Sequence, residues 1–209
     1  MYLAFLDLAV TPGRLALGKA VLTPLAIGYK LGVVPGNLCR AAAVRVGFSG
    51  VPLALVEQHG AMFAEHVLPT VIRPEAMERI NWHKLQGDTI AVVSGALEVA
   101  LAHWCASQDL NLIASRLEHR NGILTGRYLG EQCVRAEKSR RINEQYILPS
   151  YDTIYAYGDT PEDLDMLALA NKRFYKWQEQ HSSAGANNSF KRTPGPHPAL
   201  TNPSRSGAA

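Results

Sequence analysis

Apolar residues recur three and four positions apart through the first third of the chain, which is the spacing of one face of a helix. Pro12 and Gly13 interrupt this pattern after the first segment. The segments with helical spacing are residues 2–10 (YLAFLDLAV), 14–32, 36–48 and 52–68. The pattern therefore predicts a lobe built from helices over residues 1–72.

From residue 73 the pattern changes to helices that alternate with short β-branched runs. Gly87 is placed to end the first of these helices, and Asn121-Gly122 supplies the tight turn of a hairpin. Helices are expected in 74–86, 97–108, 136–147 and from Pro161 onward, and strands in 88–95, 152–159 and, as a last edge strand, 172–177. Such alternation implies right-handed βαβ units and a parallel sheet. The expected fold class is α/β, with its core in residues 73–181.

The last residues, 182–209, are rich in Ser, Pro, Gly, Ala and Asn. A segment of this composition buries too little apolar surface to offset the entropy of ordering it. We expect a disordered tail without a catalytic role.

Composition removes several classes of function. The chain has 209 residues and a formal net charge of +3, without an arginine-rich stripe, so a nucleic-acid partner is not expected. Its three cysteines, Cys39, Cys105 and Cys133, are far apart and form no CxxC pair. A sparse, odd set favours reduced thiols used in packing and a cytoplasmic location.

The N-terminal lobe is basic as well as apolar. Its most apolar stretch, residues 15–34, is broken by two lysines and a proline, whereas a membrane span needs about 20 nearly uncharged residues. A buried or amphipathic helix is therefore favoured over membrane contact. Residues 1–56 contain one acid, Asp7, against five bases. The simple interpretation is a solvated basic face, and the alternative is attraction of an anionic substrate.

Two carboxylates follow the strand in YAYGDTPEDLDML, residues 155–167. Gly158 allows a tight turn after the strand, so Asp159 stands at the strand tip and Asp163 in the first turn of the next helix. Acids at a helix start are favourable without any metal. The GDxxxD spacing after a buried strand nevertheless favours a Mg²⁺ site, because Mg²⁺ prefers carboxylate oxygens together with substrate phosphate.

Ser94, Gly95 and Lys138 are the candidate phosphate-binding residues. Ser94 and Gly95 end the strand IAVVSG and lead into a helix, where a hydroxyl and free backbone N–H groups can cradle phosphate. An ordinary helix cap is the alternative for Ser94. Lys138, in AEKSRR, could neutralise phosphate as a point charge, although a single helix lysine is usually solvated. The order of the three polar clusters along the chain carries more weight than any one of them.

That order resembles the haloacid dehalogenase superfamily, in particular its phosphoserine-phosphatase-like branch (subfamily IB) with a helical cap. The resemblance covers roughly residues 1–178 and is strongest in VLPTVIRPEAMERINWHKLQGDTIAVVSGALE, LTGRYLGEQCVRAEKSRR and IYAYGDTPEDLDMLALA. It places the second motif of the family on Ser94, the third on Lys138, and the fourth on Asp159 and Asp163. It implies a Rossmann-like core with a helical cap over residues 1–72. The implied activity is Mg²⁺-dependent hydrolysis of a small phosphorylated metabolite through an aspartyl-phosphate.

The first motif of the family, DxDGT, is not found intact. In LAFLDLAVT only Asp7 and Thr11 agree with it, and Ala9 stands where the acid/base residue belongs. Residues 2–35 align better, without a gap, with the first cap helices that follow DxDGT in this branch. On that alignment Met1 begins inside the cap, the first strand of the core is absent, and Asp7 is a polar helix residue.

Two hypotheses follow. The chain is a phosphatase with Lys138 as a catalytic residue, Ser94 and Gly95 binding substrate, and Asp159 and Asp163 binding Mg²⁺. Alternatively it is a truncated, inactive homologue that retains phosphate or metal binding. A missing strand would leave an apolar gap in the sheet, and a homodimer formed through that gap is an expected consequence.

Overall fold

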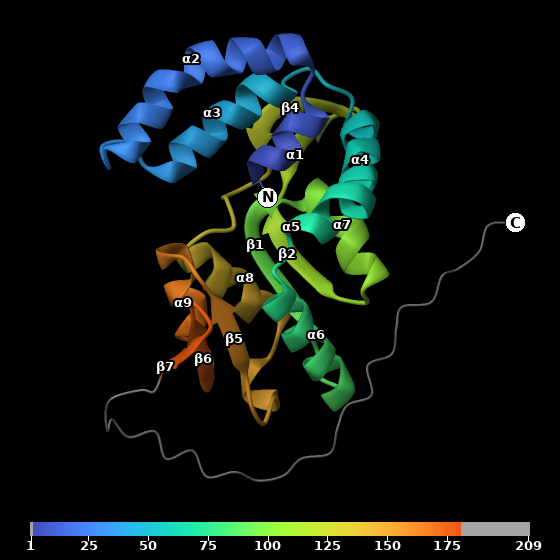
Figure 1. The fold of residues 1–209 in the computed structure, drawn as a ribbon, viewed down its shortest axis with the longest axis vertical. Helices are drawn as coiled ribbons and strands as arrows, with labels where there is room; N and C mark the ends of the chain where they lie inside the picture. The colour runs from blue at the N-terminus through green and yellow to red at the C-terminus, as the bar shows by residue number, and fades with distance from the viewer. Residues whose placement is uncertain (1, 181–209) are drawn as a thin grey trace, which may run out of the picture.

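A computed structural model describes residues 2–180, and the tail predicted for residues 182–209 lies outside the described residues. Helices from the first third of the chain gather at one end of the molecule, and the parallel strands, with further helices around them, extend toward the other (Figure 1). This is the α/β arrangement, with a parallel core and a helical lobe, that the sequence predicts. The helices are α1 (Tyr2–Ala9), α2 (Pro12–Lys30), α3 (Gly36–Phe48), α4 (Leu53–Met62), α5 (Leu68–Val71), α6 (Pro74–Gln86), α7 (Glu98–Ser107), α8 (Ala136–Gln145) and α9 (Leu164–Leu167). The strands are β1 (Ala91–Leu97), β2 (Asn111–Ser115), β3 (Leu117–Arg120), β4 (Ile123–Tyr128), β5 (Tyr155–Gly158), β6 (Lys172–Tyr175) and β7 (Gln178–Gln180).

The first residues form a helix, α1, as the alignment with the cap predicts. Its apolar face is buried through Phe5, whose ring packs on those of Phe48 (centroids 6.3 Å apart) and Phe63 (5.4 Å). Asp7 lies on the exposed face of the same helix. Because residues 2–9 are helical, Asp7 does not stand at the end of a sheet strand.

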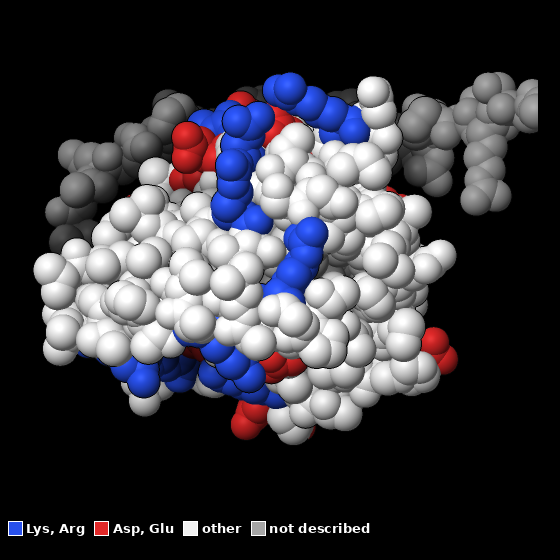
Figure 2. Space-filling model, turned by 90° about the horizontal axis from the view of Figure 1, so that it is seen from above, with Lys and Arg blue, Asp and Glu red and all other residues white. Residues whose placement is uncertain are grey.

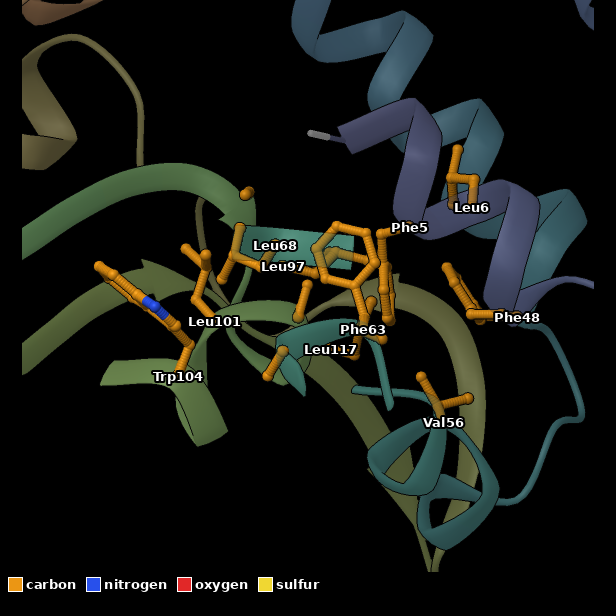
Figure 3. Packing of buried hydrophobic residues seen from close by; sticks show 14 of the residues in the cluster. Phe5, Leu6, Phe48, Val56, Phe63, Leu68, Leu97, Leu101, Trp104 and Leu117 are labelled. Carbon is orange, nitrogen blue, oxygen red and sulfur yellow. The ribbon is translucent and has the colours of Figure 1, made fainter. Parts of the chain in front are cut away.

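One hydrophobic cluster runs from the helical lobe into the α/β part (Figure 3). It joins Phe5 of α1 and Val56 of α4 to Leu97 at the end of β1 and Leu101 of α7. Helices α4 and α7 approach closely at Gly60, where a Cβ atom would lie 2.0 Å from the Val99 carbonyl oxygen. The two parts are therefore packed together rather than joined by a free linker.

The hairpin predicted around Asn121-Gly122 is present as β3 and β4. Both turn residues have positive φ, 49° at Asn121 and 77° at Gly122, as this type of turn requires. Strand β4 packs on α3 of the helical lobe, and Gly126 permits this contact, since a Cβ there would lie 2.8 Å from Cβ of Ser49. The hairpin thus belongs in space to the helical lobe.

The parallel strands form two separate ladders. Strand β1 pairs in parallel with β2, and β5 pairs in parallel with β6. Strand β7 adds to β6 in an antiparallel sense, so the predicted position of residues 172–177 at the sheet edge is wrong. Trp177 and Lys176 have positive φ and turn the chain back, which lets three further residues cover that edge.

Strands β1 and β5 are not hydrogen-bonded to each other, and a groove lies between the two ladders. It encloses about 400 Å³ and is walled by both strands and by side chains from α6 and α8. In a parallel ladder the N–H and C=O groups of one residue point to the strand on one side, and those of the next residue point to the other side. The carbonyl of Ile90 accepts a hydrogen bond from β2, and that of Ile154 accepts one from the start of β6. The backbone groups of Ala91, Val93, Tyr155 and Tyr157 therefore point the other way, into the groove.

A polar relay crosses this groove. The imidazole of His83 on α6 contacts Asp88 Oδ2 through Nδ1 at 2.7 Å and the Tyr157 hydroxyl through Nε2 at 3.0 Å. His83 is buried, and four other aromatic rings contact it or Tyr157, namely those of Trp82, Tyr155, Phe174 and Trp177. Burial also raises the pKa of Tyr157 above its usual value. The relay holds α6, the start of β1 and β5 in a fixed relation.

The helices of the core match the predicted positions with two corrections. Helix α6 ends at Gly87, which adopts φ 75° as expected. Helix α7 begins after Leu97, so Ser94 is not its cap. The helix predicted from Pro161 is a 3₁₀ turn over Pro161–Asp163 followed by the single turn of α9. It ends early because the chain turns at Asn171 to pair with β5 through the Ile154 carbonyl.

The three cysteines are free, as the sequence predicts. Cys105 and Cys133 are buried, and burial raises the pKa of the Cys105 thiol to about 11. A thiol with a raised pKa is a poor nucleophile. These two side chains therefore serve in packing.

Candidate active site

Lys138 is the centre of the site. It lies in the first turn of α8, yet only 5% of its surface is exposed. Unlike most lysines on helices, it is therefore not solvated. Its ammonium donates to Oδ1 of Asp163 and, at 3.2 Å, to the carbonyl oxygen of Val93 in β1. Lys138 therefore joins the carboxyl end of β1 to the loop that follows β5.

Both carboxylate oxygen atoms of Asp163 accept hydrogen bonds. Its Oδ2 accepts hydrogen bonds from the backbone N–H groups of Asp159 (3.1 Å) and Thr160 (3.0 Å) and from the Thr160 hydroxyl (2.8 Å). Burial by itself would raise the pKa of the Asp163 carboxyl. The hydrogen bond and charge of Lys138, with the bonds from Thr160, outweigh burial and hold that pKa below its usual value.

Gly158 makes this arrangement possible. A Cβ atom at Gly158 would lie 2.5 Å from Cβ of Asp163, closer than any real Cβ contact. Gly158 does not have a positive φ, so backbone conformation does not require a glycine here. The close approach of Asp163 does. Replacing the hydrogen with a methyl group would push Asp163 away from Lys138.

Asp159 occupies the tip of the strand, where its side chain is 43% exposed. Its Oδ2 lies 2.7 Å from a guanidinium nitrogen of Arg73, the residue that precedes α6. The carboxylate thus already faces a positive group, and solvent reaches both partners. Arg73 was not singled out in the sequence, because no local pattern connects it with Asp159.

Ser94 and Gly95 lie in an irregular part of β1, where the register with β2 shifts between Ser94 and Leu97. The Ser94 hydroxyl accepts a hydrogen bond from the Ala96 N–H at 3.1 Å. The Gly95 carbonyl accepts from the Ser115 hydroxyl at 3.1 Å. A Cβ at Gly95 would lie 2.8 Å from a methyl group of Val134.

The structure brings these predicted residues to one edge of the core. Lys138 contacts Asp163 directly, Asp163 contacts the backbone of Asp159, and the carbonyl that Lys138 contacts belongs to the residue before Ser94. Polar residues that follow the carboxyl ends of parallel strands can meet in this way, and a common phosphate and Mg²⁺ site for all five residues stays a prediction.

A cap-to-core clasp beside the site was missed by sequence reasoning. Arg40 of α3 forms an ion pair with Glu162 (2.9 Å) and a hydrogen bond with the Gln132 side chain (2.9 Å). Glu162 lies between Asp159 and Asp163 in the chain. The only sequence signal was the excess of bases in the helical lobe, which does not name a partner 122 residues away.

These residues suit Mg²⁺ in part. In the part of the chain that the structure describes, no three His, Cys, Asp or Glu side chains come together as a metal site. Mg²⁺ commonly binds through one or two carboxylates completed by substrate phosphate and water. Asp159 fits that use, because it is exposed, offers hard oxygen atoms and already holds a cationic group. Asp163 fits it less directly, since its oxygen atoms are engaged.

Comparison with known proteins identifies the family. The family model described as haloacid dehalogenase-like hydrolase matches residues 1–168. The chain belongs to this family. Protein CicA of Caulobacter vibrioides is 31% identical over 175 residues, which cover 83% of this chain and 78% of CicA. A histidinol-phosphatase of Neisseria meningitidis is 30% identical over 125 residues, 56% of each protein.

Two solved structures share the fold. A protein of unknown function from Bordetella pertussis has a TM-score of 0.67 at 20% identity, over 77% of this chain and 74% of that one. A probable phosphoserine phosphatase from Vibrio cholerae has a TM-score of 0.60 at 20% identity, over 83% of this chain and 51% of that one. The expected relation to phosphoserine-phosphatase-like proteins of the family is confirmed at the level of the fold.

Proposed function

We propose that this chain binds and hydrolyses the phosphate monoester of a small metabolite with the help of Mg²⁺. The observation that carries the proposal is the buried ammonium of Lys138, held at the carboxyl edge of the sheet by Asp163 and by the carbonyl next to Ser94. Burying a charge is costly unless it is paired and hydrogen-bonded, and the two partners of Lys138 hold its ammonium at this edge of the sheet. The family of this chain and its similarity to a histidinol-phosphatase also support hydrolysis of a phosphate ester.

Each residue has a distinct proposed role. The hydroxyl of Ser94 and the N–H of Gly95 bind phosphate oxygens, and Lys138 offsets their charge as a point cation. Asp163 positions Lys138. Asp159 would hold Mg²⁺ together with the substrate phosphate, and the ion would stabilise the charge that develops on the phosphoryl oxygens. Arg73 would have to give up its contact with Asp159 when substrate binds.

Transfer through an aspartyl-phosphate, the route general to the family, requires a carboxylate aimed at phosphorus. Asp7 is not assigned this role, because it lies on the exposed face of α1. This favours a second candidate function: a protein that binds phosphate with Mg²⁺ but does not turn substrate over. The two candidates share the binding residues and differ in hydrolysis.

The deciding experiment combines turnover and binding. We expect 4-nitrophenyl phosphate to be hydrolysed in the presence of Mg²⁺, and Ser94→Ala to weaken binding of inorganic phosphate about fivefold, the value of one hydrogen bond. Asp7→Asn is the matched control and should leave both unchanged. Phosphate binding without hydrolysis would select the second candidate, and the absence of both would reject the proposal.

A further inference from the structure

The helical lobe carries an apolar surface that no other described part of the protein covers. It is formed by one stripe along α2 and its end: Leu17, Val21, Ile27 and Leu31, with exposed fractions of 57%, 52%, 53% and 72%. Leu17, Ala20, Pro24, Ile27 and Leu31 are spaced three or four residues apart, which puts them on one face of the helix. Monomeric proteins rarely expose contiguous apolar surface of this kind without a use for it.

The opposite face of α2 is the one that packs. Gly18 is the buried residue of this helix and lies against Val46 of α3. Arg14, at the start of α2, donates to the backbone carbonyls of Gly47 (3.2 Å) and Ser49 (2.7 Å). The helix is therefore fixed to α3 by one side, and its apolar stripe is held outward.

The charges beside this stripe have one sign. Lys30 follows Ile27 by three residues and so lies beside the stripe, whereas Lys19 is exposed farther round α2, and residues 8–56 contain no acid. Figure 2, seen from the side of the helical lobe, shows a broad uncharged surface with isolated basic side chains and acidic ones only toward the margins. Lysines in this position can lay their alkyl stems on apolar surface and direct the ammonium groups to an anionic layer.

We propose that this stripe docks on the surface of an anionic lipid membrane, with α2 lying in the plane of the interface. A helix with an apolar face flanked by lysines binds in this way, through buried apolar area and attraction to acidic headgroups. No described helix is long and apolar enough to cross the membrane, so the contact is peripheral. The sequence favoured a buried or amphipathic helix over membrane contact here, because it could not show which face of α2 packs on α3.

Charge argues against a second copy of the chain as the occupant. In a two-fold symmetric dimer the same patch meets itself. Lys19 and Lys30 of both copies would then come close together, without acids on this surface to offset them. An anionic lipid surface complements the same lysines.

The test is sedimentation of the purified chain with vesicles. We expect binding to vesicles of phosphatidylcholine and phosphatidylserine at about three to one, weak binding to phosphatidylcholine alone, and loss of binding at high salt. Removing Lys19 with Lys19→Gln should weaken binding about fivefold. The pair Leu17→Asp and Ile27→Asp should abolish it, and both sites are exposed, so folding should persist by circular dichroism.

Leu85→Asp on α6 is the matched control, because Leu85 is 84% exposed and α6 lies far from α2 in Figure 1. It should bind vesicles like the unaltered chain. The proposal is overturned if anionic vesicles do not sediment the protein or if Leu85→Asp weakens binding as much as the α2 pair. It is also overturned if the α2 pair abolishes a dimer in gel filtration while vesicle binding is absent. The readout is binding alone, so it is independent of any phosphatase activity.

Discussion

At the scale of single residues, the buried contact between Lys138 and Asp163 governs both stability and the proposed chemistry. The side chains are 7% and 9% exposed, so neither charge is well solvated. Pairs of this kind contribute little net stability when intact, but removing one partner leaves a buried charge without compensation. The pair therefore acts as a constraint on the site as much as a source of stability.

We predict that Lys138→Met lowers the free energy of unfolding by about 3–5 kcal/mol, because it leaves the Asp163 carboxylate buried and unpaired. The double variant Lys138→Met with Asp163→Asn should lose clearly less, since both charges are removed. Urea unfolding followed by circular dichroism measures both. A double variant as unstable as the single one would contradict this account.

The lowered pKa of Asp163 makes a prediction about pH. A carboxyl whose pKa is lower in the folded state stabilises the fold above its unfolded pKa of about 3.9, and this contribution is lost as pH falls through the lower, folded pKa. Thermal stability should therefore fall steeply below about pH 4. In Asp163→Asn that part of the pH dependence should disappear, leaving a flatter profile.

At the scale of elements, the turn after β5 depends on Gly158. We predict that Gly158→Ala destabilises the protein by about 1–3 kcal/mol through overpacking against Asp163, and weakens phosphate binding as well. Gly13→Ala in α2 is the control, because nothing lies within 4 Å of a Cβ there, and it should be neutral or stabilising by up to about 1 kcal/mol. Equal effects of the two substitutions would show that close approach is not the cause.

Local rules predicted most elements correctly. They failed where the end of a helix or the position of a strand depends on contacts with distant parts of the chain. Gly87 and the Asn121-Gly122 turn were predictable because each meets a backbone requirement within a few residues. The short α9 was not, because the chain there leaves the helix to pair with β5. Nor was the position of β6 inside its ladder, which depends on the return of the chain at Trp177.

At the scale of the whole molecule, the sheet is divided by the groove between β1 and β5. Val92 and Val93 of β1 and Tyr157 of β5 are only half-buried, whereas Ile113 and Ala114 of β2 are buried. Backbone groups that face the groove lack a strand partner among the described residues, and His83 bridges part of the gap. A dimer through this groove, which the sequence suggested, remains a prediction for gel filtration.

Hydrogen exchange should reveal the division. We predict that the amides of Val93 and Tyr157, which face the groove, exchange much faster than that of Ile113, because no neighbouring strand protects them. Residue-resolved nuclear magnetic resonance can measure this. Equally slow exchange at all three amides would mean that the groove is closed or filled in solution.

The clasp between the helical lobe and the core makes a separate prediction. Arg40 and Glu162 are partly exposed, so a double-mutant cycle with Arg40→Ala and Glu162→Ala should give a coupling of about 0.5–1 kcal/mol. The single variant Arg40→Ala should also speed exchange at the edge of α3 nearest Gln132. A coupling near zero would show that the shared hydrophobic cluster alone holds the two parts together.

By itself the sequence determined the order of helices and strands, the α/β class, the basic character of the first lobe and the motifs that relate the chain to its family. These are consequences of spacing and local backbone requirements, which act over a few residues. Only the tertiary structure decided that Lys138 is buried against Asp163, that Asp159 faces Arg73, that the sheet is divided, and that α2 holds its apolar stripe outward. Each of these depends on the path that brings distant segments together, and no periodicity along the chain encodes that path.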